Sequence, residues 1–151
     1  MAASACKTSV IGVSPNDTTT KPVTPKTAMT ADRDSIPWTA DPTNSSKLND
    51  SITIYGKGTT HGAPADTLIF KIKYTSPGTY VLTKDQASYR TVKLVDTVSN
   101  IHKLDSLYSN SINITYDMAT NRASGTFNVK FIDSAAKDIS FLNGKFNTPL
   151  K

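Results

Sequence analysis

Seven aspartates of this 151-residue chain open the same short pattern: Asp, then Ser or Thr, then a small aliphatic residue or Thr. All 12 acidic residues are Asp, and the composition predicts only about 1.3 such tripeptides by chance. Each tripeptide places a hydroxyl beside a carboxylate, so the chemistry it could support is attachment of a group to the side-chain oxygen. The hydroxyl-bearing residues are Thr18, Ser35, Ser51, Thr67, Thr97, Ser106 and Ser134.

The tripeptide resembles the O-glycosylation acceptor used by exported proteins of Bacteroidota. This resemblance implies that some of the seven hydroxyls carry covalent glycans in a protein of the cell envelope. Turn chemistry is the alternative, because Asp, Ser and Thr side chains at strand ends satisfy free backbone groups. Turn chemistry does not, however, require an aliphatic residue or Thr at the third position seven times.

Small residues directly precede the only cysteine, Cys6. The segment is similar to the end of a bacterial lipoprotein signal peptide, which implies lipidation of Cys6 and anchoring in the outer membrane. Residues 1–26 therefore divide into a signal-peptide remnant and a Thr- and Pro-rich linker, which composition predicts to be extended. Alternatively, residues 10–13 could add as a strand to the sheet edge of another subunit or envelope protein.

The charge pattern argues against nucleic-acid binding. The net charge is +5, but the cations are scattered along the sequence and only three are Arg. Nucleic-acid binding typically needs a concentrated basic stripe with Arg and stacking aromatic residues. No apolar run reaches 18 residues, so no membrane-spanning helix is predicted.

No group of residues has the composition of a catalytic site or a metal site. His61 and His102 are the only histidines and lack metal-ligand spacing, so we expect neither a metal nor another cofactor. The chain also lacks Glu and a Gly-x-Ser-x-Gly motif. Glycoside hydrolysis would need two carboxylates at a set separation, usually in an aromatic cleft. We therefore expect a protein that is not an enzyme.

Period-2 alternation of apolar and polar residues, broken by turn residues, fills the chain from residue 27 onward. The alternation is clearest in residues 67–74, and residues 111–116 and 123–132 predict a hairpin. We expect an all-β domain over residues 27–151, an antiparallel β-sandwich or flattened barrel of eight to ten short strands.

Three further expectations concern single positions. Trp38 is the only Trp and is expected in the core. Asn143-Gly144 predicts a two-residue hairpin, or alternatively a bulge within one strand. Residues 98–109 are the only segment with room for a helical turn.

Several short segments resemble small β-rich envelope lipoproteins of unknown function that are common in Bacteroidota. The resemblance implies an envelope location and a β-rich fold, and it brings no catalytic residues. The segments that carry it are Pro37-Trp38-Thr39-Ala40, Pro77-Gly78-Thr79-Tyr80, Ile112-Asn113-Ile114-Thr115, Ser124-Gly125-Thr126-Phe127 and Asn143-Gly144-Lys145-Phe146.

These observations predict a non-enzymatic, O-glycosylated protein of the cell surface with a structural or adhesive role. It would be lipid-anchored or assembled into a surface filament. The alternative is a glycan-binding accessory lipoprotein of a nutrient-uptake system. In that case Tyr55, Tyr89 and Tyr108 are the candidate ligand-binding platforms, although cross-strand packing also explains Tyr residues in strands.

Overall fold

The computed structural model describes residues 26–58, 66–92, 99–133, 135 and 137–151. Every regular element within these residues is a β-strand, as the alternation predicts. In chain order the strands are β1 (Ala28–Arg33), β2 (Ile36–Asp41), β3 (Ser46–Leu48), β4 (Ser51–Gly58), β5 (Asp66–Lys73), β6 (Gly78–Val81), β7 (Ala87–Val92), β8 (Ser99–Leu104), β9 (Ser111–Asp117), β10 (Arg122–Ile132) and β11 (Asp138–Pro149).

Eight of these strands close an antiparallel barrel. They follow the order β11-β1-β2-β4-β5-β7-β8-β10, and β10 pairs again with β11. The other three strands extend the sheet: β9 pairs with β10, β6 pairs with β9, and β3 pairs with β4. The expected all-β fold, a β-sandwich or flattened barrel, is confirmed.

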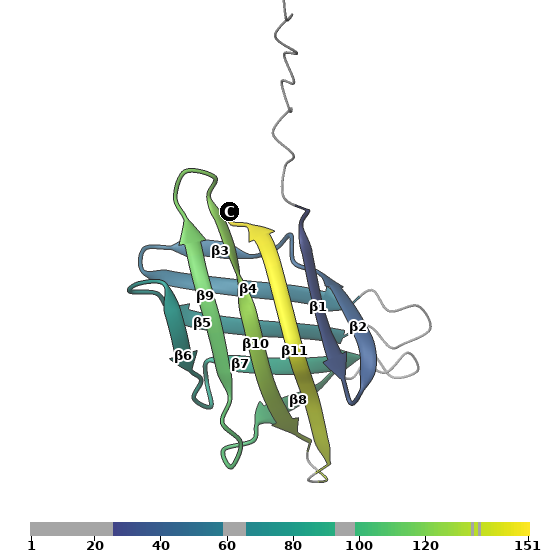
Figure 1. Cartoon of the computed structure of the whole chain (residues 1–151). Helices are drawn as coiled ribbons and strands as arrows, with labels where there is room; N and C mark the ends of the chain where they lie inside the picture. The colour runs from purple at the N-terminus through teal and green to yellow at the C-terminus, as the bar shows by residue number, and fades with distance from the viewer. Residues whose placement is uncertain (1–25, 59–65, 93–98, 134, 136) are drawn as a thin grey trace, which may run out of the picture.

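The barrel is flattened into two layers whose strands cross at a steep angle (Figure 1). We call β6, β9, β10, β11, β1 and β2 the first layer, and β3, β4, β5, β7 and β8 the second layer. Two corners join the layers, and at each corner only two residue pairs connect the strands: β2 to β4, and β8 to β10. Side chains fill the narrow interior that this arrangement leaves.

Aromatic side chains from the two layers meet in the core. Phe70 of the second layer packs against Phe127 of the first, with ring centroids 5.0 Å apart. Trp38 lies in the core, as predicted, and packs edge-on against Phe141 at 5.1 Å. Tilted and edge-to-face pairs contribute about 0.5–1.5 kcal/mol each beyond the area that they bury.

The predicted hairpin at Asn143-Gly144 is wrong, and the alternative, a bulge within one strand, is correct. β11 continues through both residues, Asn143 has a φ of 53°, and the register shifts against both neighbouring strands. A Cβ atom at Gly144 would overlap the ring of Phe127. Here Asn-Gly allows a strand to approach the core closely and does not reverse the chain.

Residues 98–109, the only segment with room for a helical turn, contain β8. β8 pairs with β7 over residues 99–103. His102 and Leu104 are buried, whereas Ile101 and Lys103 are exposed, so the segment has the period of a strand. The alternation of this strand does not stand out in the sequence, because a histidine occupies a buried position and an isoleucine an exposed one.

The two rims of the barrel differ in what they carry (Figure 1). β1 begins and β11 ends at the upper rim in this view. The β1–β2 turn and the connection from β8 to β9 lie at the opposite rim. The chain therefore enters and leaves the barrel at one end and places these two connections at the other.

Candidate functional site

The first candidate hydroxyl in the described residues, Ser35, lies at the tip of the β1–β2 hairpin. Asp34 and Ser35 have φ values of 50° and 68°, which is the signature of a type I′ two-residue turn. The side chain of Ser35 is exposed. Ile36, the third residue of this tripeptide, is also 66% exposed. The whole tripeptide is therefore displayed at the end of a hairpin.

Ser106 and Ser51 are exposed in similar positions. Ser106 follows β8 in the connection to β9, and Leu107 beside it is 96% exposed. Ser51 is the first residue of β4, directly after a turn in which Asn49 has a φ of 51°. Its third residue, Ile52, is fully buried. All three hydroxyls are accessible to an attached group.

Thr67 lies in a different environment. It is half-buried in β5, where Lys57 of β4 and Arg90 of β7 flank it in register. The strand is paired on both sides, so the backbone of this tripeptide is not displayed. Thr67 is therefore the poorest acceptor among the four candidates in the described residues. Thr18, Thr97, Ser134 and the lipidation candidate Cys6 lie outside the described residues.

Turn chemistry accounts for the Asp of several tripeptides. Asp105 accepts a hydrogen bond from the backbone N–H of Leu107 at 2.9 Å, and Asp133 accepts one from Ala135 at 2.8 Å. Asp34 accepts one from the backbone N–H of Ser140 at 2.8 Å, which ties the β1–β2 turn to β11. The bonds of Asp105 and Asp133 are Asx-type turn bonds, and that of Asp34 is a similar bond to a residue far away in the sequence.

Turn chemistry does not account for the third residue. Ile36 and Leu107 are large, apolar and mostly exposed, so packing does not require an aliphatic side chain at either position. Burial does explain it at Ile52 and Leu68, which are 0% exposed. The tripeptide excess thus has a structural cause at some positions and none at Ile36 and Leu107.

One tripeptide aspartate, Asp66, forms the most connected polar cluster in the described part of the chain. Asp66 is 2% exposed, and its carboxylate forms an ion pair with Arg33 Nη1 at 2.9 Å. It also accepts hydrogen bonds from Trp38 Nε1 at 3.0 Å and from the Tyr89 hydroxyl at 2.9 Å. Arg33 and Trp38 belong to the first layer, and Asp66 and Tyr89 to the second. The carboxylate is saturated with donors and has a structural role.

The sequence carried a signal for this cluster that the tripeptide pattern hid. Asp66 is in phase with the buried residues Leu68, Phe70 and Ile72, so it falls on the core face of its strand. Arg33 is similarly in phase with the buried positions of β1. A charged residue in phase with a buried face needs a partner.

The environment of the cluster shifts two pKa values. Burial, together with the charge of Asp66, raises the pKa of Tyr89 above its ordinary range, so its hydroxyl stays protonated and donates to Asp66. Burial lowers the pKa of His102, while the nearby Asp133 partly offsets this shift. His102 Nε2 lies 3.1 Å from Thr91 Oγ1, and its Nδ1 has no hydrogen-bond partner among the described residues.

The three tyrosines proposed as ligand platforms lie in different places. Tyr89 was a wrong candidate, because it is 0% exposed and its ring packs against Phe141 and His102. Tyr55 is half-buried on the outer face of the second layer. Tyr108 is half-buried, and Lys130 Nζ lies 4.9 Å from its ring centroid.

Tyr108 lines a hollow of about 530 Å³ beside the β8–β9 connection. Apolar side chains from three strands line the hollow, with Lys84, Lys103 and Asp105 among its polar groups. Pockets of roughly 300–1,000 Å³ with mixed lining are typical of small-molecule sites. The apolar lining residues are Val81, Leu82, Leu104 and Ile132.

In the described residues, no group of three or more His, Cys, Asp or Glu side chains could hold a metal ion. The same residues contain no helix long and apolar enough to cross a membrane.

A family model described as a domain of unknown function, DUF6252, matches residues 25–148. The match includes every strand of the barrel except the last residue of β11. The chain belongs to this family. No curated protein sequence and no solved structure is detectably similar to it.

We predict that Asp66→Asn destabilises the DUF6252 domain. The three partners of the carboxylate all donate hydrogen bonds to it. In the variant the amide NH₂ of the new side chain would face one of these donors, and Arg33 would lose its counter-ion. Breaking a buried pair costs about 3–5 kcal/mol, and we expect the lower end because Arg33 is 31% exposed. Denaturant unfolding of Asp138→Asn, an exposed carboxylate, is the control and should match the unsubstituted protein. Equal unfolding free energies for Asp66→Asn and the control would contradict the structural role.

We also predict that the DUF6252 domain loses stability in mild acid through His102. The lowered pKa means that the unfolded state binds a proton more readily than the folded state as the pH falls below about 6.5. The unfolding free energy should therefore decrease between pH 7.5 and pH 5.5, by no more than about 1.3 kcal/mol, the limit for one titrating group. His102→Gln should reduce this slope. An identical pH dependence in the variant would show that His102 does not cause it.

Proposed function

We propose that this DUF6252 protein is a non-enzymatic, O-glycosylated protein of the bacterial cell surface with a structural or adhesive role. The observation that carries the proposal is the exposure of Ile36 and Leu107 beside exposed hydroxyls. An enzyme that reads Asp, a hydroxyl residue and an aliphatic residue would need all three accessible. Ser35 and Ser106 meet this requirement.

The arrangement of the rims supports a tethered domain. The barrel begins with β1 at one rim, and the connections that carry Ser35 and Ser106 lie at the other (Figure 1). If the N-terminal segment is anchored through a lipid on Cys6, these hydroxyls would point away from the membrane. Glycans there would shield turns and exposed edges from proteases and from unplanned strand pairing. Assembly into a surface filament is a special case of the same proposal.

We predict that Leu107→Gln removes one glycan while leaving the fold unchanged. Leu107 is 96% exposed, so the substitution removes no packing, and the Asp105 turn bond goes to its backbone N–H. The intact mass of protein made in its own host should decrease by one glycan. Leu48→Gln is the matched control, because Leu48 is 74% exposed and ends no tripeptide.

A glycan that persists in Leu107→Gln would contradict recognition of the tripeptide. A protein that carries no added mass before either substitution would contradict glycosylation itself. Loss of the same mass in Leu48→Gln would show that the effect does not depend on the motif.

The second candidate function is a glycan-binding accessory lipoprotein, and the Tyr108 hollow favours it. Its volume and mixed lining suit a small ligand, and the Tyr108 ring could pack against the apolar face of a sugar. This function needs no covalent modification of the chain.

For this candidate we predict that Tyr108→Ala abolishes the binding of neutral oligosaccharides found on a glycan array. Leu107→Gln, in the same connection but outside the hollow, should retain it. Binding that survives Tyr108→Ala would exclude the hollow as the site. An array without any bound neutral glycan would contradict this candidate function.

A further inference from the structure

The outer face of the second layer is unusually basic. Its outward positions on β4, β5, β7 and β8 carry cations that are all exposed, and among the described residues at these positions there is no Asp. We call this surface the basic face. Its strand cations are Lys57, Lys71, Lys73, Arg90 and Lys103.

The strand register brings these cations together although they are far apart in sequence. Lys57 of β4, Thr67 of β5, Arg90 of β7 and Ile101 of β8 form one row across the sheet. In the adjacent row, Ser88 pairs with Lys103. Neighbouring strands lie about 4.8 Å apart and successive outward residues roughly 7 Å apart, so each cation has others nearby.

The opposite layer does not share this charge. Its outward strand positions carry both signs, with acidic and basic side chains interspersed. The excess positive charge of the structured domain is therefore concentrated on the basic face. The charged outward residues of the first layer are Asp32, Asp41, Asp117, Asp138, Arg122, Lys130 and Lys145.

Structural needs do not explain the basic face. Lysines often protect sheet edges, but β5 and β7 are paired on both sides and are not edges. Like charges on neighbouring strands repel and destabilise the sheet. No cation of the basic face is paired with a carboxylate within the described part of the chain, where the one salt bridge is Arg33–Asp66.

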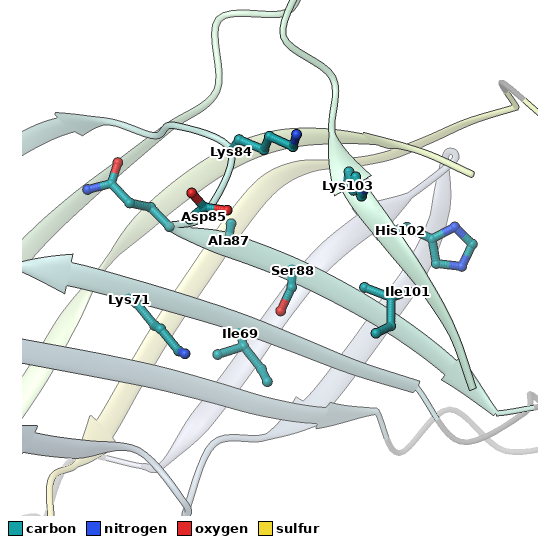
Figure 2. Close-up of a pocket in the computed structure, with 10 residues that line it drawn as sticks. Ile69, Lys71, Lys84, Asp85, Ala87, Ser88, Ile101, His102 and Lys103 are labelled. Carbon is teal, nitrogen blue, oxygen red and sulfur yellow. The ribbon is translucent and has the colours of Figure 1, made fainter. Parts of the chain in front are cut away.

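A shallow hollow of about 350 Å³ lies within the basic face (Figure 2). Lys71 from β5 and Lys103 from β8 stand on either side of it, and Lys84 joins them from the connection before β7. Ile69 lies next to Lys71 on β5, and Ile101 lies next to Lys103 on β8. Ile101 is 55% exposed, so the hollow offers apolar surface next to positive charge. Asp85 is its single carboxylate.

We propose that the basic face binds an acidic polysaccharide, a polymer of sugars bearing carboxylate or sulfate groups. Such a chain alternates anionic substituents with apolar ring faces, which matches lysines interspersed with Ile69, Ile101 and Tyr55. Lysine suits these anions because it acts as a compact point charge and does not require bidentate geometry. The proposal does not depend on glycosylation of the chain itself.

Two other polyanions fit less well. Nucleic-acid readers usually insert an element into a groove and use Arg forks or stacked aromatics, whereas the strand cations here include a single Arg and lie on a sheet. An anionic membrane surface attracts clustered lysines. However, a flat layer of headgroups would leave the hollow and its isoleucines unfilled.

The test uses the full-length chain and polygalacturonate, a polymer of hexuronic acid, as the probe. Calorimetry or affinity electrophoresis at low salt should detect binding that weakens steeply as salt screens the charges. Lys71→Gln combined with Lys103→Gln should weaken binding at least tenfold. Lys137→Gln combined with Lys145→Gln changes the net charge equally, lies outside the basic face, and should change binding less than threefold.

Neutral dextran should not bind. Equal weakening by both double variants, or no binding to polygalacturonate, would overturn the proposal. Stronger binding of the same face to phosphatidylglycerol vesicles or to duplex DNA, lost in the Lys71/Lys103 double variant, would assign the face to that polyanion and overturn the polysaccharide.

Discussion

The buried carboxylate of Asp66 is the interaction on which the relation of the two layers depends. It belongs to the second layer and accepts hydrogen bonds from Arg33 and Trp38 of the first layer, as well as from Tyr89 beside it. The β2–β4 corner next to it has only two residue pairs. Gly58 lies at this corner, and a Cβ atom there would overlap the Asp66 carboxylate. The geometry of this corner therefore depends on the polar contacts of Asp66 as much as on backbone pairing between β2 and β4.

This role changes how the tripeptide pattern is understood. Asp66-Thr67-Leu68 exists because a core ion pair and a core leucine are needed there, and its threonine lies in a fully paired strand. The tripeptides at Ser35 and Ser106 are different, because their third residues are exposed and contribute no packing. One statistical pattern therefore contains positions with a structural cause and positions without one, and only the second kind argues for modification.

Much of the fold could be predicted from the sequence, because buried residues recur at every second position in β5 and through most of the β9–β10 hairpin. β8 was not predicted, since His102 is buried beside an exposed Ile101. The bulge in β11 could not be separated from a hairpin, because Asn-Gly suits both and only contact with Phe127 decides between them.

The candidate sites were predictable to different degrees. Exposure of Ser35 and Ser106 follows from turn residues that local sequence identifies. The basic face could not be predicted from local sequence, because Lys71, Arg90 and Lys103 come together only through the pairing of β5 with β7 and of β7 with β8. Cations that are scattered along the sequence are thus gathered on one surface. Their spacing in the sequence therefore does not describe how positive charge is distributed over the folded domain.

The most direct test of the glycoprotein account is the mass of four tryptic peptides from protein isolated from its own host. We expect added sugar mass on residues 34–47 and 104–122, which contain Ser35 and Ser106 beside the exposed Ile36 and Leu107. We expect none on residues 48–57 and 58–71, which contain Ser51 and Thr67 beside the buried Ile52 and Leu68. Unmodified masses for all four peptides would contradict the account.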